Sequence, residues 1–267
     1  MGTARRRARK RHMQLGLLNE AGTKPRSTRG GKRPGAGRPA KGSRAGAPHK
    51  RRDAFKSSSP LHVVLRVCPE VIRALRTLRG AAVYRAVRAA TVVMSKHDEA
   101  RIVHLSIQRT HLHLIVEAND RLALARGMKA FQISAAKQIN RLLRVGERRR
   151  RGQVFADRYH AEVITSPRYA RHVLNYVMNN WRKHREDREE VARGWLVDPF
   201  STAVLFDGWK ELGDRKRWSY RATYEPLAVR EPRTWLLTEA WRRHGLVSCD
   251  EVPSTATRRA GRSRVGA

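Results

Sequence analysis

The sequence predicts an α+β fold. One antiparallel sheet is expected in the order β-α-β-β-α-β, the ferredoxin-like or RRM-like arrangement, with an added C-terminal helix after the last strand. Three observations predict it: apolar residues alternate in four short stretches, they recur at helical spacing in three longer ones, and Pro, Asn, Asp and Ser mark the boundaries between them.

The four expected strands follow from alternation with a period of two residues. In the first, Leu61, Val63, Leu65 and Val67 share one face, and the same pattern returns three more times along the chain. The second and third strands are joined by only Arg109 and Thr110, which predicts a tight antiparallel connection. The expected strands span residues 61–67, 101–108, 110–118 and 159–165.

The three expected helices begin at recognisable start signals. Pro69 suits the first turn of a helix, Asp120 is a good N-cap, and Ser166 precedes Pro167 in the same way. The apolar spacing of the first helix continues past Gly80, so one continuous helix is predicted there. The expected helices span residues 69–94, 121–142 and 167–185.

Composition points to a polyanionic partner. The 267 residues include 58 Lys and Arg against 23 Asp and Glu, a formal charge of +35. Such an excess favours nucleic acid. No apolar run reaches the roughly 18 residues of a membrane span, so no membrane contact is expected. Two cysteines, Cys68 and Cys249, exclude a disulfide framework and a four-thiolate zinc site and suit a cytoplasmic protein.

Composition also divides the chain into four parts. Residues 1–52 hold 17 Lys and Arg, one acidic residue and no Phe, Tyr or Trp, which predicts a disordered basic arm. Residues 53–186 carry the predicted sheet and helices. Residues 187–252 form an accessory region, in which 233–244 has the pattern of an amphipathic helix and packing onto the core is expected. Residues 253–267 are predicted to be a disordered tail.

Two basic stretches are candidates for DNA contacts. Gly37-Arg38-Pro39 resembles the AT-hook, which lies in the minor groove of A·T-rich DNA, but Ala40 stands where that motif prefers a basic residue, so an unspecific cationic tail is the favoured explanation of Arg38. The loop before the last strand contains Arg148, Arg149, Arg150 and Arg151, followed by Arg158, and could hold phosphates. A solvated loop without specific contacts is the alternative.

The third predicted strand carries a pair of histidines. Because strand side chains alternate between faces, His111 and His113 point the same way, about 7 Å apart along the strand. Two imidazoles on one sheet face can hold a divalent cation that a third ligand completes. The alternative is an ordinary pair of strand histidines. His104 and Glu117 are weaker candidates for the same site.

The helix after the last strand supplies the remaining candidates. Tyr176 and Asn180 are four residues apart and therefore share one helix face. If that face turns toward the histidines, a phenol, a carboxamide and two imidazoles converge. A core tyrosine with a satisfied hydroxyl is the alternative for Tyr176.

Together these residues resemble a known family. His111-Leu112-His113, the tyrosine helix and the order of elements are similar to the single-tyrosine HUH transposases, and closest to the REP-associated tyrosine transposases. Tyr176-Val177-Met178-Asn179-Asn180 resembles that family's Tyr-x-x-x-Asn-Pro, with Trp181 in place of the proline. Further similar stretches are Arg126-Gly127-Met128-Lys129, Gln138-Ile139-Asn140 and Gly152–Tyr159.

The resemblance implies an activity, a cofactor and a substrate. Tyr176 would attack a DNA phosphodiester and form a 5′-phosphotyrosine link, which a 3′-hydroxyl later resolves. His111 and His113 would hold Mg²⁺ or Mn²⁺, with Asn180 as an additional ligand. The substrate would be single-stranded DNA with a short hairpin, such as a REP-like palindrome. A bacterial, nucleoid-associated location follows, and a homodimer remains open.

Two other functions remain open on the residues alone. The protein could be a nucleic-acid-binding module with an RRM-like sheet and a basic arm that cuts nothing, although its 6% aromatic content offers few stacking residues. It could also be a metal nuclease in which water attacks and Tyr176 only packs.

Overall fold

The computed structural model describes residues 54–213 and 222–254. The predicted basic arm, with Arg38, lies outside the described residues, and so does nearly all of the predicted tail at 253–267. Everything below concerns the described part of the chain.

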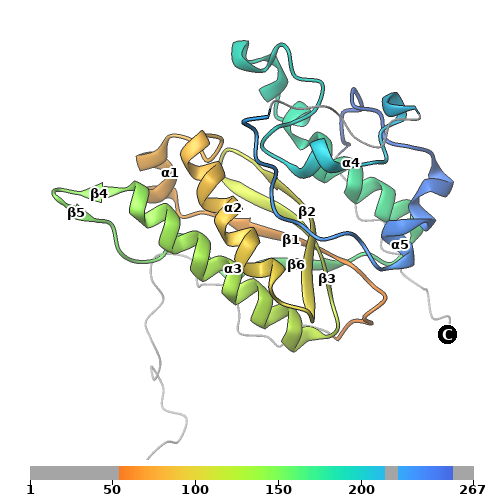
Figure 1. Cartoon of the computed structure of the whole chain (residues 1–267), viewed down its shortest axis with the longest axis horizontal. Helices are drawn as coiled ribbons and strands as arrows, with labels where there is room; N and C mark the ends of the chain where they lie inside the picture. Colours follow the sequence, from red (N-terminus) through yellow and green to blue (C-terminus); the bar gives the residue numbers. More distant parts are fainter. Residues whose placement is uncertain (1–53, 214–221, 255–267) are drawn as a thin grey trace, which may run out of the picture. The chain divides into compact units, whose positions relative to one another are not determined.

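The centre of the fold is a four-stranded antiparallel sheet in the order β2-β3-β1-β6 (Figure 1). The strands are β1 (Leu61–Arg66), β2 (Ala100–Ile107), β3 (His111–Ala118) and β6 (His160–Val163). In the sheet, β1 and β3 are the central strands and β2 and β6 are the edge strands, which is the ferredoxin-like arrangement. The predicted fold class is therefore confirmed.

Two helices cover one face of the sheet. They are α2 (Ala81–Ser95) and α3 (Arg121–Leu142), which pack beside each other in Figure 1. Asp120 caps α3 by accepting the Ala123 N–H at 2.7 Å, as its side chain predicts. Apolar residues of the strands and of α3 fill the space between the sheet and these helices: Leu61, Val63, Leu65, Leu105, Leu112 and Leu114 come from the strands, and Met128 and Phe131 from α3.

The third helix, α4 (Pro167–Lys183), packs on the opposite face. Ser166 caps it by accepting the Tyr169 N–H at 3.2 Å. Its apolar stripe joins strand residues of that face in a second core, which includes Val103, Ile115, Val173, Leu174, Val177 and Met178. A β-bulge helps here, because the β2–β3 register shifts between Ile102 and His104 and leaves Val103 without a partner of its own. The sheet thus has an apolar face under α2 and α3 and a mixed face under α4.

The first predicted helix and the basic loop differ from expectation. The helix is broken into α1 (Pro69–Leu75) and α2, because Arg76 has a positive φ of 66° and Gly80 is extended and caps α2. Helical spacing of apolar residues persists across the break, which is why the sequence predicts one helix. The loop at 146–152 includes half of a short hairpin of β4 (Arg144–Val145) and β5 (Arg148–Arg149).

The accessory region packs around α4, as the sequence predicts. The amphipathic segment at 233–244 forms α5 (Trp235–Thr238) and a 3-10 helix (Ala240–His244) rather than one continuous helix. Trp209 and Trp241 are fully buried in the α4 core. Among the described residues, four further 3-10 helices precede the one at Ala240–His244; they are Glu186–Arg188, Glu190–Ala192, Thr202–Leu205 and Lys210–Leu212. In the described part of the chain, no helix has both the length and the apolar character to cross a membrane.

Polar contacts fix the last residues of this region to the helix. Arg171 forms a bidentate ion pair with Glu251, both contacts at 2.8 Å, and Asn175 donates to the same carboxylate at 2.7 Å. Asn179 donates to the Ser248 carbonyl at 2.9 Å. Bidentate, partly buried pairs hold geometry better than exposed ones. The outer side of α4 is therefore fixed along more than two turns.

Candidate active site

The sheet face beneath α4 brings the predicted histidines together. His113 lies opposite Val64 of β1 and Ser106 of β2 in the register, and His111 lies opposite Arg66 at the end of the sheet. The Nε2 atoms of His111 and His113 are only 2.9 Å apart. Two nitrogens that bind one ion at about 2.1 Å each and at a right angle lie about 3.0 Å apart. The pair therefore has the spacing of two ligands of one cation.

The other ring nitrogen of each histidine has its own neighbour. His113 Nδ1 lies 3.1 Å from Nε2 of His62 on β1, and His111 Nδ1 lies 3.1 Å from the Thr110 hydroxyl. The His62 and His113 rings are inclined to each other by only 24°, with their centroids 5.2 Å apart. Such contacts fix the tautomer and orientation of metal-binding imidazoles. Both Nδ1 atoms are held, and both Nε2 atoms face the same point.

Burial keeps these imidazoles neutral. Loss of solvent lowers the pKa of His111 and of His62 to about 4 each, and it lowers the pKa of His113 well below its usual value. Neighbouring imidazoles lower the pKa of His113 further, because a second positive charge beside the first is unfavourable. At neutral pH the three rings are uncharged, and neutral imidazole is the form that binds metals.

Tyr176 lies beside this pair. Its ring centroid is 5.1 Å from that of His113 and 5.9 Å from that of His62, in edge-to-face arrangements. The Lys183 ammonium lies 4.7 Å from the centre of the phenol ring. Burial raises the pKa of Tyr176, so its hydroxyl is protonated at neutral pH. The structure thus places the phenol of α4 against the imidazole of His113 on β3, so this face of α4 turns toward the histidine pair.

Asn180 is completely buried one turn further along α4. Within the described residues, neither the oxygen nor the nitrogen of its amide has a hydrogen-bond partner. A buried amide without a partner costs about 1–3 kcal/mol, so a ligand at this position would relieve a real penalty. The donor set of two imidazoles and a carboxamide fits a divalent cation.

The replacement of proline by Trp181 changes the end of the helix. Helix α4 continues to Lys183, and Trp181 is fully buried with its ring centroid 6.3 Å from that of Trp195. The continuation brings His184 to within 6.2 Å of His111, measured between ring centroids. The longer helix therefore adds a cation and an imidazole, Lys183 and His184, at the rim of the candidate site.

The weaker candidates His104 and Glu117 have other roles. His104 is buried, with Nδ1 3.3 Å from the Thr202 hydroxyl and its ring against Phe206. Glu117 accepts N–H bonds from Arg233 at 3.0 Å and from Thr234 at 2.8 Å, so it caps the start of α5. Both share the sheet face of the histidine pair, but both serve the accessory region.

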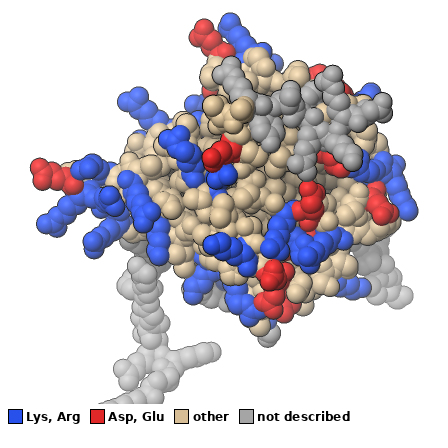
Figure 2. All heavy atoms as spheres, viewed as in Figure 1, with Lys and Arg blue, Asp and Glu red and all other residues tan. Residues whose placement is uncertain are grey.

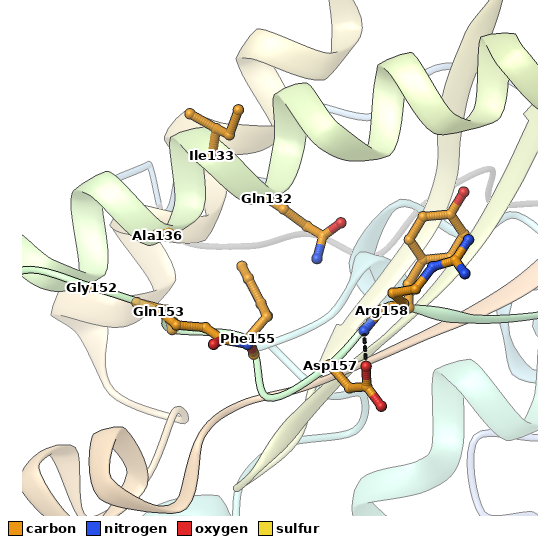
Figure 3. A pocket seen from close by; sticks show the side chains of 10 residues that line it. Gln132, Ile133, Ala136, Gly152, Gln153, Phe155, Asp157 and Arg158 are labelled. Carbon is orange, nitrogen blue, oxygen red and sulfur yellow. Dashed lines mark hydrogen bonds between the residues drawn. The ribbon is translucent and has the colours of Figure 1, made fainter. Parts of the chain in front are cut away.

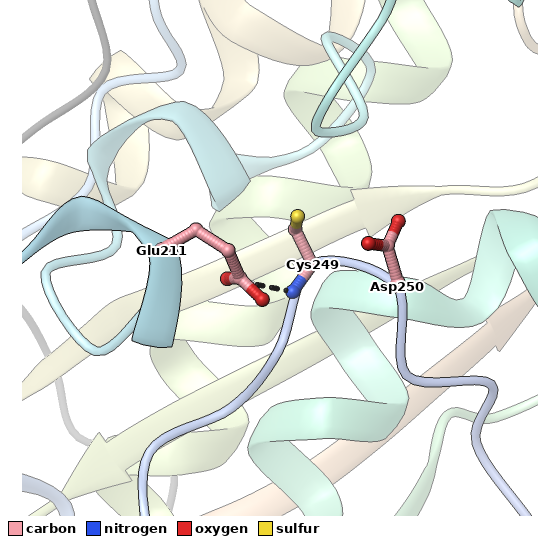
Figure 4. A group of neighbouring side chains, drawn as sticks. All are labelled: Glu211, Cys249 and Asp250. Atoms are coloured by element: carbon pink, nitrogen blue, oxygen red, sulfur yellow. Dashed lines mark hydrogen bonds between the residues drawn. The ribbon is translucent and has the colours of Figure 1, made fainter.

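A separate group of side chains that could hold a metal ion consists of Glu211, Cys249 and Asp250 (Figure 4). Glu211 accepts the Cys249 N–H at 3.0 Å and a hydrogen bond from the Ser248 hydroxyl at 2.5 Å. Burial and the nearby carboxylates raise the pKa of Cys249 to about 11, which keeps its thiol protonated. These contacts tie the last residues of the accessory region to the 3-10 helix at Lys210–Leu212.

The arginines of the predicted basic loop divide into two kinds. Arg148, Arg149 and Arg151 are exposed on and beside the β4–β5 hairpin, where blue side chains gather at the left of Figure 2. Arg150 instead turns inward: it donates to Asn140 Oδ1 at 2.6 Å and to the Gln153 carbonyl at 3.0 Å. Arg150 therefore fixes the base of the hairpin, and the other three remain available to a polyanion.

Arg158 lies on the rim of a cavity of about 490 Å³ between α3 and the segment before β6 (Figure 3). Gln132 of α3 points toward Phe155 across this cavity, and the Arg158 N–H donates to the Asp157 carboxylate at 2.7 Å. This segment pairs with the end of β1, since Ala156 donates to the Arg66 carbonyl. It therefore reaches the same end of the sheet as His111, whose strand partner is Arg66.

Sequence reasoning missed His62. Its signal is present, because His62 occupies the face of the first strand opposite to Leu61 and Val63, and that face is expected to oppose the next layer. What the sequence does not give is the register, which pairs Val64 with His113 and so puts His62 diagonally across from it.

Comparison with known proteins found one family and one solved structure that this chain resembles. Residues 59–180 match the family described as "Transposase IS200 like". A solved structure of a REP-associated tyrosine transposase bound to a REP hairpin aligns with 70% of this chain and 99% of its own, at 16% identity and a TM-score of 0.42. No curated protein matched the chain. The family match covers the sheet, both covering helices and α4 as far as Asn180.

Proposed function

We propose that this protein is a metal-dependent tyrosine transposase that cleaves and rejoins single-stranded hairpin DNA through a 5′-phosphotyrosine intermediate. One observation supports the proposal most: the Tyr176 ring lies 5.1 Å from that of His113, whose Nε2 is 2.9 Å from that of His111. A nucleophile and a cation site thus lie side by side on one sheet face.

His111 and His113 would hold Mg²⁺ or Mn²⁺, with Asn180 as the additional ligand. Imidazole ligands favour Mn²⁺ over Mg²⁺, which prefers oxygen. When bound, the ion supplies charge neutralisation at the scissile phosphate. The chain contributes the fixed orientation of both rings, through His62 and Thr110, and the neutral state that burial enforces.

Tyr176 would attack the phosphorus. Its oxygen forms a bond to phosphorus, the bond to the 3′-oxygen of the upstream strand breaks, and that oxygen leaves as a hydroxyl with the proton that the phenol has lost. Rejoining reverses these steps from an incoming 3′-hydroxyl. The ester keeps the bond energy, so no ATP is needed. Because the phenol is protonated at neutral pH, losing its proton is part of the barrier.

The substrate follows from charge and shape. Exposed Arg148, Arg149 and Arg151 extend from the same end of the sheet as His111, which suits a duplex stem beside a cleaved single strand. An RRM-like module that stacks bases on its open sheet has less support, because α4 covers that face here.

The test is to incubate end-labelled hairpin DNA with the protein and Mn²⁺, then denature. Hairpins with a stem and unpaired flanks should give a denaturation-resistant protein–DNA adduct and a free 3′-hydroxyl product. Free 5′-phosphate ends without an adduct would instead indicate a nuclease in which water attacks. Binding without any cleavage would indicate a nucleic-acid-binding protein, and either result would refute the proposal.

His62→Ala is expected to weaken Mn²⁺ binding about 10- to 100-fold, the usual effect of losing the partner of a metal-binding imidazole. With the contact to His113 Nδ1 lost, the ring is free to turn its Nε2 away from His111. Calorimetry or Mn²⁺ electron paramagnetic resonance on the unreacted protein measures this directly. His62→Gln, which can accept the same hydrogen bond, should restore most of the affinity. Equal affinity in wild type and His62→Ala would show that His62 only fills space.

The double variant Arg148→Ala/Arg149→Ala is expected to flatten the salt dependence of hairpin binding. Each lost phosphate contact lowers the slope of log affinity against log salt by about 0.9 on duplex and 0.7 on single strands, so the change should be about 1.4–1.8. Arg150→Ala is the matched comparison. It should lower the melting temperature of the protein, because Arg150 holds the base of the β4–β5 hairpin. An unchanged slope in the double variant would show that the β4–β5 hairpin of the protein does not contact the DNA.

A further inference from the structure

An aromatic pocket lies outside the candidate active site. It occupies about 580 Å³ between the start of α2, the segment at 191–200 and residues 223–225. Four aromatic side chains line it, from all three segments: Tyr84, Trp195, Phe200 and Tyr224. Its size is that of a small-molecule site, and no step of the proposed chemistry uses it.

The rings of this pocket are held rigidly by their edges. The Tyr84 hydroxyl lies 2.9 Å from the Glu225 carbonyl and 2.9 Å from the Tyr224 hydroxyl, which in turn donates to the Pro199 carbonyl at 2.8 Å. The polar ends of both tyrosines are thus satisfied within the protein. What these side chains can offer a ligand is the flat face of a ring.

Trp195 completes the pocket. It is half-buried, and its ring centroid lies 6.1 Å from that of Phe200 and 6.3 Å from that of Trp181 behind it. The Arg79 guanidinium covers part of Phe200 at 4.8 Å from the ring centre. The Trp195 and Phe200 rings are tilted by 54° to each other, and an indole and a phenyl ring beside a cation offer the kind of faces on which bases of any sequence stack.

The charges around the pocket leave one cation available. Arg79 is buried between Asp198 and Glu186, with contacts of 2.9 Å to each, and Arg88 pairs with Glu225 at 3.0 Å. Arg85 is exposed, and among the described residues no ion pair or hydrogen bond engages its guanidinium. It lies one turn of α2 before Arg88 and on the same face. An apolar slot with one uncommitted guanidinium fits a base and its phosphate.

The pocket and the candidate active site flank the same turn of the sheet. Phe200 accepts the Ile107 N–H through its carbonyl at 2.9 Å, and Gln108 donates to the His111 carbonyl at 2.9 Å. The turn between β2 and β3 therefore joins Phe200 on one side to His111 on the other. A single strand that leaves His111 around this turn would meet the aromatic pocket.

We propose that the aromatic pocket binds an unpaired nucleotide of the substrate strand, with its base stacked on Trp195 and Phe200 and its phosphate paired with Arg85. The inference rests on the proposed function for the identity of the strand. The pocket's second wall, at 191–200, lies entirely beyond the residues that match the transposase family, so this contact is a feature of the accessory region.

The experiment measures equilibrium binding in EDTA, where no cleavage occurs, of fluorescein-labelled hairpin DNA with and without an unpaired flank. Trp195→Ala should weaken binding of the flanked hairpin about 5- to 150-fold, the range for loss of one stacked base. It should leave binding of the flankless hairpin unchanged. Trp195→Phe should retain affinity and Trp195→Leu should not, because leucine keeps the apolar bulk but lacks a ring face. Arg193→Ala, an exposed neighbour that does not line the pocket, is the control for charge.

A second readout locates the base. Flanks with 5-iodouracil at successive positions should crosslink to Trp195 or Phe200 from one of those positions. Equal affinity of wild type and Trp195→Ala for the flanked hairpin, or crosslinks only outside the pocket, would overturn the proposal. Because binding is measured without metal, this result is independent of adduct formation. A protein that forms no adduct but loses flank binding in Trp195→Ala would contradict the transposase proposal alone.

Discussion

Tyr176→Phe is expected to abolish the covalent protein–DNA adduct while hairpin binding stays at the wild-type level. The change removes only the oxygen that would bond to phosphorus. Within the described residues no hydrogen bond engages that hydroxyl, and the ring that contacts His113 and His62 is kept. Removal of a nucleophile typically costs several orders of magnitude in rate, and here no other oxygen can take its place in the adduct.

The measurement is a denaturing gel of labelled hairpin DNA with Mn²⁺, beside an anisotropy titration in EDTA. Tyr169→Phe is the matched control, since Tyr169 lies on the same helix two turns earlier, with its ring against His172. The control should form the adduct as the wild type does. An adduct in Tyr176→Phe would mean that another residue is the nucleophile.

The double variant His111→Ala/His113→Ala is expected to lose Mn²⁺ binding at this site and to lose cleavage at every Mn²⁺ concentration that supports the wild type. Loss of even an outer partner weakens metal binding about 10- to 100-fold, and this variant removes two direct ligands. Asn180 alone cannot replace them, because a single neutral amide binds these ions weakly.

Mn²⁺ binding by calorimetry and cleavage of hairpin DNA should fall together. His97→Ala is the matched control. His97 lies in the turn that leads into the start of β2, whereas His111 follows the end of β2, so the two histidines lie at opposite ends of this strand. Hairpin binding in EDTA should be equal in all three proteins. Cleavage by the double variant at wild-type Mn²⁺ levels would refute the metal assignment.

Local pattern predicts most of the fold because each element buries a regular face. Alternation indicates a strand at 61–67, and β1 is Leu61–Arg66; Ser166 and Pro167 predict the start of α4 at the correct residue. The break before α2 is missed because Arg76 adopts a positive φ that no local residue preference signals. Apolar spacing alone does not detect a turn that keeps the same face buried.

The candidate site is predictable only where its residues share an element. His111 with His113, and Tyr176 with Asn180, follow from the periods of one strand and one helix. His62 does not, because its contact with His113 depends on strand register. The inward orientation of Arg150 is not predictable for a similar reason: it depends on the register of the β4–β5 hairpin, and four consecutive arginines give no sign of which one turns inward.

The attachment of α4 to the end of the accessory region has a consequence for stoichiometry. Since Arg171, Asn175 and Asn179 tie this helix to Glu251 and Ser248 of the same molecule, the phenol stays above its own sheet. Under the proposed mechanism, one molecule then carries every reacting group. Turnover per protein should be the same in dilute and concentrated solution, and the DNA ends rather than the tyrosine must change places between cutting and joining.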